Sequence, residues 1–166
     1  MGAWGDPEAF CTAVRGQLVG VLVLHGHDRP VAEELAQEAL VRTWQRWGSL
    51  EYPKAFALRC AMNLSRSWVR RRLAERRAYD AVGPGQPRAV DAPDVAAAVA
   101  VRGAVAALPQ RQREAIVARY FADLSIAETA KAMRCAPGTV QALTAQAIDN
   151  LRRAGLDIDI EEETRA

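Results

Sequence analysis

The stretch of sequence that most clearly defines the fold is residues 125–153, SIAETAKAMRCAPGTVQALTAQAIDNLRR. It opens with Ser125-Ile126-Ala127-Glu128, a capping box in which a serine hydroxyl and a glutamate carboxylate satisfy free N–H groups at a helix start. A turn is expected at residues 134–136, and Pro137 suits the first turn of a longer helix ending near Ala154. This layout predicts a helix-turn-helix, whose second helix lies in the major groove of DNA. Any two short helices joined by a tight turn share the layout, so the motif alone leaves DNA binding open.

Two further helices are predicted upstream of this motif, over the alanine-rich residues 95–107 and over 109–121. Residues 79–94 concentrate glycine and proline and lack a helical period, so we expect a flexible linker there. The sequence therefore predicts a four-helix domain over 95–156, followed by an acidic tail over 157–166.

Residues 1–78 predict a first domain of three helices. Asp6-Pro7-Glu8 combines a capping aspartate with a first-turn proline, and the helix it begins is expected to end near His25. Apolar residues at three-to-four spacing predict a second helix over 31–48, and Pro53 opens a third. The expected fold is therefore all-α, with two small helical domains joined by a flexible linker.

Positive charge is concentrated at the end of the third helix, although the formal net charge of the chain is only +2. Residues 59–77 contain one acidic residue, Glu75, and seven arginines: Arg59, Arg66, Arg70, Arg71, Arg72, Arg76 and Arg77. The segment also contains Trp68 and the hydrogen-bonding side chains Asn63, Ser65 and Ser67. Arginine binds phosphate and aromatic rings stack on unpaired bases, so the segment predicts contact with nucleic acid. The alternative is a solvated helix end, where cations also suit the helix macrodipole.

The distribution of cysteine and histidine argues against a metal site or a disulfide framework. Cys11, Cys60 and Cys135 are an odd number without CxxC spacing, and we expect buried thiols. His25 and His27 stand two residues apart, so they cannot share a helical face as ligands, and surface or capping roles are expected. No metal and no cofactor is expected.

Other functional classes are excluded by missing patterns. The sequence contains no P-loop and no HExxH motif, so it is not expected to be an enzyme and no catalytic residue is assigned. No apolar run approaches the roughly 20 residues of a membrane span, and the N-terminus lacks a signal pattern. A cytoplasmic protein without membrane insertion is expected.

Several motifs resemble one known family when they are taken together. They are AEELAQEALVRTW at 32–44, NLSRSWVRRR at 63–72, LPQRQR at 108–113 and GTV at 138–140. Their order and spacing are similar to those of the extracytoplasmic-function group of bacterial sigma-70 RNA polymerase sigma factors, in particular the small actinobacterial-type members. The resemblance covers nearly the whole chain.

The resemblance implies an alternative sigma factor that binds core RNA polymerase and directs promoter recognition and melting, under the control of a partner such as an anti-sigma factor. It places the polymerase contact on the second helix, with Leu35, Gln37, Glu38, Leu40 and Trp44 as contact or supporting positions. The residues predicted to bind polymerase are Leu35, Gln37, Glu38 and Arg42. Helical geometry puts Leu40 and Trp44 on one stripe, which we expect in the core, while the polar residues face outward.

The resemblance also assigns two DNA sites. Residues 1–78 correspond to sigma region 2, which holds the opened minus-ten strand at Asn63, Ser67, Trp68, Arg70 and Arg71. Residues 95–156 correspond to sigma region 4, which reads minus-35 DNA through Thr139, Gln141, Thr144, Gln146 and Arg152.

The second domain departs from the family pattern at its helix-turn-helix. Arg134 stands where the family has a glycine, Ala136 stands where it has a serine cap, and Asp149 is the only formal charge between residues 137 and 150. Weak minus-35 binding is therefore expected, because phosphate neutralisation supplies most non-specific DNA affinity. Leu143 fits either the core or a protein-binding face. These departures motivate an alternative function, a divergent sigma-like regulator that binds polymerase or another transcription factor.

Overall fold

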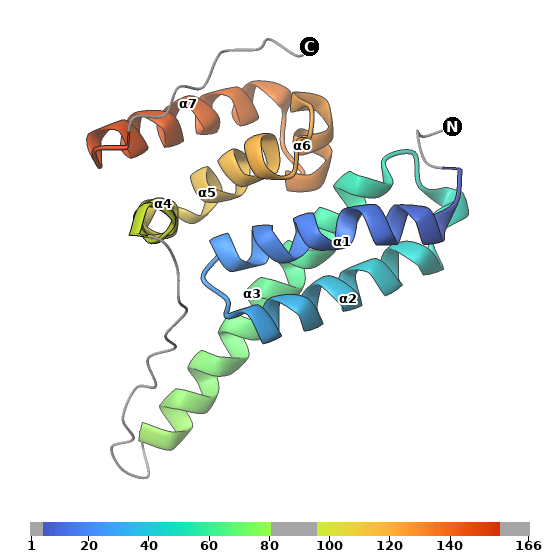
Figure 1. Ribbon diagram of the computed structural model, residues 1–166, viewed down its shortest axis with the longest axis horizontal. Coiled ribbons are helices and arrows are strands. Elements are labelled where there is room, and N and C mark those ends of the chain that lie inside the picture. Colours follow the sequence, from blue (N-terminus) through green and yellow to red (C-terminus); the bar gives the residue numbers. More distant parts are fainter. Residues whose placement is uncertain (1–4, 81–95, 157–166) are drawn as a thin grey trace.

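The computed structural model describes residues 5–80 and 96–156, and both ranges are helical without strands (Figure 1). The first range contains α1 (Pro7–Leu24), α2 (Arg29–Gln45), the short helix η1 (Trp47–Ser49) and α3 (Pro53–Asp80). The second contains α4 (Ala96–Ala107), α5 (Gln110–Ile116), η2 (Val117–Phe121), α6 (Ile126–Met133) and α7 (Pro137–Arg153). Most of the predicted linker, 81–94, and the predicted acidic tail lie outside the described residues. The all-α fold expected from the sequence is confirmed.

Side-chain caps begin the first two helices. Asp6 Oδ2 accepts from the Ala9 amide at 2.8 Å, and Asp28 Oδ1 accepts from the Val31 amide at 3.2 Å. α1 ends at His25, which donates from Nδ1 to the Val21 carbonyl at 2.9 Å. The capping role expected for His25 is therefore confirmed.

The core of the first domain lies between α1, α2 and α3. α1 packs on α2, and α2 packs on α3, around fully buried side chains such as Phe10, Leu22 and Ala61. α1 has the length and mean hydropathy, 1.2, of a weak candidate for a membrane span. Burial of Phe10, Leu18 and Leu22 in this core accounts for its apolar face.

His27 and Trp44 lie where the sequence did not predict them. His27 is only 5 % exposed and shares a 2.6 Å hydrogen bond between Nε2 and the Ser65 hydroxyl, so the predicted surface position is wrong. Trp44 is 48 % exposed, and the predicted core position is wrong. The prediction for Trp44 failed because helical periodicity gives a residue's direction relative to its own helix, while burial depends on what packs there. The prediction for His27 failed because its burial comes from α3, through Ser65, which lies 38 residues away in the sequence.

The helix-turn-helix has the capping chemistry that the sequence predicts. Ser125 and Glu128 form the complete capping box at the start of α6. Arg134 ends α6 in the left-handed region at φ 52°, which costs a non-glycine residue roughly 1 kcal/mol. Ala136 begins α7 without a side-chain cap, and Pro137 occupies the first turn.

The helix predicted over 109–121 is present, but it changes its hydrogen bonding half-way. α5 gives way at Val117 to η2, a single π-helical stretch in which the Ala122 amide donates to the Val117 carbonyl at 2.9 Å. Such π-turns widen a helix locally and often occur at functional positions.

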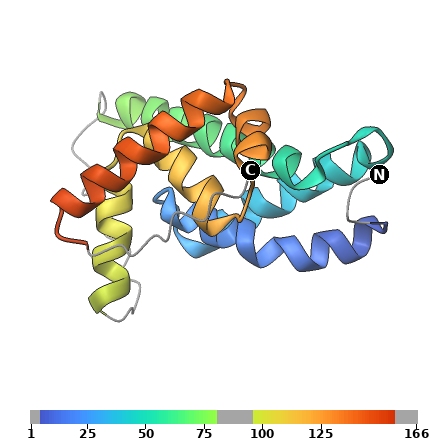
Figure 2. The same ribbon diagram turned by 90° about the horizontal axis from the view of Figure 1, so that it is seen from above.

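The two domains are in contact. α6 packs against α3, and α1 packs against η2 (Figure 2). Gln17 Nε2 donates to the Phe121 carbonyl at 2.8 Å, and Arg66 of α3 forms a 2.6 Å ion pair with Glu114 of α5. The helix-turn-helix is therefore seated on the helix that carries the arginine-rich segment.

Candidate nucleic-acid interface

The structure brings four polar side chains of the first domain together around one open cavity. Arg42 of α2 and Asn63, Ser67 and Arg71 of α3 line a space of about 430 Å³. Asn63, Ser67 and Arg71 recur along α3 at intervals of four residues, and this spacing places them on one face of the helix. The three were predicted as minus-ten residues, whereas Arg42 was predicted as a polymerase contact.

The arginines of this face are available to an anion. Arg70 Nη2 donates to the Ser67 hydroxyl at 3.1 Å, and no ion pair to Arg70 or Arg71 occurs within residues 5–80 and 96–156. Arg72 differs, because it pairs with Glu75 at 3.5 Å. Guanidinium groups without a carboxylate partner attract phosphate, so this part of α3 has the electrostatics that a nucleic-acid strand requires.

The ring of Trp68 is in contact with His27 and Arg72 within the protein. Trp68 is half-buried, its ring meets the His27 ring edge-on at 5.0 Å between centroids, and the Arg72 guanidinium lies 5.5 Å from its centroid. Burial lowers the pKa of His27 below its ordinary 6.5, which keeps the imidazole neutral beside the indole. The stacking surface predicted for Trp68 is therefore partly covered by His27 and Arg72.

The polar residues predicted for polymerase contact are exposed on α2. Gln37, Glu38 and Arg42 face outward, and Glu38 pairs with Arg42 at 2.9 Å. Leu35 is only 6 % exposed and belongs to the core, so the prediction that it contacts polymerase is corrected to a supporting role.

Two large apolar side chains of α2 are exposed beside these polar residues, although apolar side chains of this helix were expected in the core. Val41 and Trp44 are 44 % and 48 % exposed, and the spacing of residues 37, 41 and 44 places them on one helical face. No pattern in α2 itself could identify this, because an exposed apolar residue and a buried one look alike in sequence.

The second helix of the helix-turn-helix presents a mainly uncharged surface. Thr139, Gln141, Gln146 and Arg152 are exposed as predicted. Gln146 Oε1 accepts from Gln112 Nε2 at 3.3 Å, which partly occupies it within the domain. Thr144 is 9 % exposed and faces the core of the second domain, so the prediction that it reads DNA is wrong. Leu143 is half-buried.

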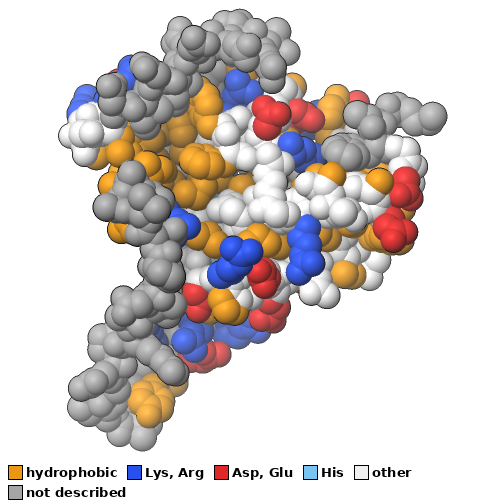
Figure 3. Space-filling view, viewed as in Figure 1, with side chains coloured by type: hydrophobic (Ala, Val, Ile, Leu, Met, Phe, Trp, Pro, Cys, Tyr) orange, Lys and Arg blue, Asp and Glu red, His pale blue; other side chains and the backbone are white. Residues whose placement is uncertain are grey.

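An apolar surface also lies on the second domain. Apolar side chains gather over α4, α5 and α7 on the face seen in Figure 3. Val99 and Val101 of α4 are exposed, as are Tyr120 and Phe121 of η2. Exposed apolar surface of this kind is typical of contacts with other proteins.

Comparisons with known proteins match the two domains separately. Residues 10–75 match the protein family Sigma-70 region 2, and residues 98–151 match Sigma-70, region 4. The RNA polymerase sigma-E factor of Streptomyces antibioticus is 30 % identical, with 73 % of this chain and 68 % of the relative covered. The RNA polymerase sigma-E factor of Streptomyces coelicolor is 29 % identical, with 73 % and 70 % covered.

Two solved structures share the fold. One is the sigma factor RpoE from Bartonella quintana in complex with the anti-sigma factor NepR, with a TM-score of 0.72 at 23 % identity over 91 % of this chain and 98 % of that one. The other is CnrH in complex with the cytosolic domain of CnrY, with a TM-score of 0.61 at 18 % identity over 90 % and 88 %. The matched ranges coincide with α1–α3 and α4–α7, in the order that the motifs predicted. The chain belongs to the extracytoplasmic-function group of the sigma-70 family, and is an alternative sigma factor of transcription initiation.

Proposed function

We propose that this sigma factor binds core RNA polymerase through the exposed face of α2 and holds the opened minus-ten strand in the cavity between α2 and α3. The observation that carries the proposal is the set of Arg42, Asn63, Ser67 and Arg71 around one space of about 430 Å³. It is wide enough for a group far larger than a water molecule, which needs only about 15 Å³ on this measure.

The roles in and beside the cavity follow from side-chain chemistry. Arg71 lines the cavity, and Arg70 is its neighbour on α3. Arg70 and Arg71 hold backbone phosphates, since each offers a planar fork of donors without a carboxylate partner among the described residues. The Asn63 amide and the Ser67 hydroxyl can donate and accept, as reading the edge of an unstacked base requires. We assign no catalytic residue, because the protein positions DNA for polymerase and breaks no bond itself.

The remaining partners are placed by the same reasoning. Gln37, Glu38 and Arg42, together with Val41 and Trp44, form the polymerase contact on α2. Thr139 and Gln141 at the start of α7 read minus-35 DNA with little help from charge. A protein partner controls the factor from the cytoplasm, as the anti-sigma factor NepR binds RpoE in the Bartonella quintana complex.

Run-off transcription with purified core polymerase on genomic fragments tests the proposal. The double variant Arg70→Ala/Arg71→Ala should lose most run-off product while it still binds core, because the removed cations contact the opened strand only. Arg29→Ala is the matched control, since Arg29 is exposed at the start of α2 and pairs with Glu33. It should transcribe as the wild type does.

Two results would count against the proposal. Unchanged run-off from the double variant would show that the minus-ten strand does not bind in this cavity. A wild-type protein that binds core but starts at no promoter would favour the sigma-like regulator instead.

A further inference from the structure

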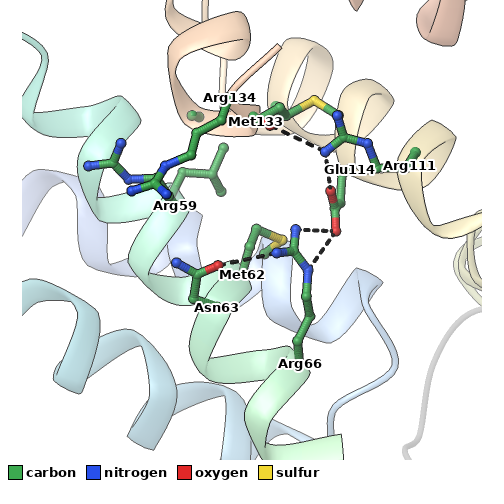
Figure 4. A pocket seen from close by; sticks show the side chains of 11 residues that line it. Arg59, Met62, Asn63, Arg66, Arg111, Glu114, Met133 and Arg134 are labelled. Carbon is green, nitrogen blue, oxygen red and sulfur yellow. Dashed lines mark hydrogen bonds and ion pairs between the residues drawn. The ribbon is translucent and has the colours of Figure 1, made fainter.

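A second cavity lies between the two domains and has no place in the proposed function. Its volume is about 170 Å³, and its lining comes from α3 on one side and from α5, η2 and α6 on the other (Figure 4). This is roughly ten times the space that a single water needs. The cavity can therefore hold a polyatomic ligand that touches both domains at once.

The lining of this cavity is strongly basic. Four arginines, Arg59, Arg66, Arg111 and Arg134, surround it with a single carboxylate, that of Glu114. Arg59 and Arg66 come from the first domain, whereas Arg111 and Arg134 come from the second. Seating α6 on α3 therefore assembles the charge, and neither domain has the whole set.

Glu114 neutralises only one end of the cavity. Its Oε1 accepts from Arg66 Nη2 at 2.6 Å, and its Oε2 lies 3.6 Å from Arg111 Nη1. The Glu114 side chain is 3 % exposed, so this carboxylate is committed to the two arginines beside it.

The other end of the cavity is left with uncompensated cations. Arg59 and Arg134 extend toward the same side in Figure 4, and neither has an acidic partner within the parts of the chain that the structure describes. Arg59 has a cation–π contact with the Phe56 ring, 4.9 Å away, which orients the guanidinium but leaves its charge in place.

The backbone at Arg134 adds a second, independent observation. Its φ of 52° is the left-handed conformation that glycine adopts without cost, and an arginine there is strained. The strain sits at the residue that turns α6 into α7 and that sends its side chain into the cavity. The strain at Arg134 is offset where its guanidinium makes an interaction that a glycine at this position could not make.

We propose that the cavity between the domains is a binding site for a small phosphorylated ligand, held by Arg59 and Arg134 with Arg66 and Arg111 behind them. Arginine forks match phosphate oxygens in pairs, and two or more unpaired forks from different elements select a polyanion over a single chloride. The small volume of the cavity, about 170 Å³, favours a free small ligand over a continuous nucleic-acid strand.

Such a ligand would regulate the protein. Because its partners lie on both domains, it stabilises the arrangement in which α6 rests on α3. Asn63 lines both this cavity and the strand-binding cavity, so an occupied site opposes entry of the minus-ten strand. This consequence, unlike the site itself, rests on the proposed function.

Calorimetric titration of the full chain with inorganic pyrophosphate tests the site. The wild type should bind one equivalent saturably, and Arg134→Gly and Arg59→Gln should each weaken the affinity by about tenfold or more. Glycine accepts the backbone of residue 134, so the first variant removes the guanidinium without endangering the fold. Arg153→Gln, an exposed arginine outside the cavity, is the matched control and should bind as the wild type does.

Three outcomes would overturn the site. They are no saturable binding by the wild type, unchanged affinity in Arg134→Gly, and binding of a single-stranded oligonucleotide at these arginines without binding of pyrophosphate. Run-off transcription in the presence of a pyrophosphatase, which hydrolyses the pyrophosphate that each nucleotide addition releases, tests the proposed function alone. If the protein binds pyrophosphate but supports no transcription from any promoter, the ligand site is supported and the proposed sigma-factor mechanism is contradicted.

Discussion

At the residue scale, the turn of the helix-turn-helix contains two residues that are energetically unfavourable at their positions. Arg134 adopts φ 52°, and Ala136 leaves the first amides of α7 without a side-chain acceptor. Pro137 offsets part of the second cost, because its fixed φ suits the first turn of a helix. The sequence pointed to both positions through the family resemblance, since Arg134 and Ala136 stand where the family has a glycine and a serine cap.

The missing cap at residue 136 makes a stability prediction. Ala136→Ser places a hydroxyl where a free amide of α7 can donate to it, and should raise the free energy of unfolding by about 1 kcal/mol. Urea unfolding followed by circular dichroism measures the change. Ala145→Ser, on the exposed middle of α7, is the control and should not stabilise. A fall in stability at residue 136 would show that the hydroxyl finds no amide there.

The buried histidine pair predicts how stability depends on pH. Burial lowers the pKa of both His25 and His27 from the ordinary 6.5. Below pH 6.5 the unfolded chain therefore binds protons that the folded chain does not, and stability must fall as the pH falls. We expect the urea midpoint to decline as the pH falls below about 6.5, and His27→Gln to reduce that slope. An equal slope in the variant would show that His27 titrates normally in the folded protein.

At the element scale, the recognition helix α7 differs from the arginine-rich helix α3 in charge. Residues 137–151 carry Asp149 as their only charge, while α3 carries seven arginines. The exposed Thr139 and Gln141 of α7 can read base edges. Because neither side chain is charged, they release no counterions from DNA. If α3 and α7 both bind DNA as proposed, their binding should differ in salt dependence.

Adding one cation to α7 tests this difference. Gln141→Lys should steepen the slope of log affinity against log salt by about 0.9 for duplex promoter DNA, the value of one neutralised phosphate. Fluorescence anisotropy at several salt concentrations measures it. Gln45→Lys adds the same charge at the end of α2 and serves as the control. If both variants steepen the slope equally, net charge rather than α7 governs binding.

At the scale of the whole molecule, the contact between the domains includes one buried carboxylate, that of Glu114. Glu114 receives Arg66 from the first domain and Arg111 and Gln110 from its own, at 2.6, 3.6 and 3.0 Å. The sequence presents it as one charge in an arginine-rich motif, next to the buried Ala115 and Ile116. The position of Glu114 beside two apolar residues was the only feature of the sequence that indicated its burial.

Removing this charge should separate the domains. Glu114→Gln keeps the size of the side chain but loses the ion pairs, so the radius of gyration from small-angle X-ray scattering should increase while helical content stays constant. Glu33→Gln, which removes an exposed carboxylate on α2, should leave the scattering unchanged. If the Glu114 variant also scatters as the wild type does, the Gln17–Phe121 bond and the apolar contacts are enough to hold the domains.

The sequence by itself determined the order of the helices, the caps at Asp6 and Ser125, and the family. These depend on local chemistry, such as the Ser125–Glu128 capping box, and on motif order, which survives without any knowledge of packing. It also placed the arginine-rich segment on the third helix, because consecutive residues keep their spacing in a helix. It did not predict the Asp28 cap of α2, nor that α3 continues through residues 79 and 80 of the predicted linker.

Only the tertiary structure decided which side of each helix is covered. Trp44 lies outside and Thr144 inside, because burial depends on the neighbouring element and not on the residue's own period. The seating of α6 on α3, and the basic cavity that it creates, depend on residues 48 positions apart such as Arg66 and Glu114. Contacts over such separations follow from the summed packing of both domains, which no local pattern records.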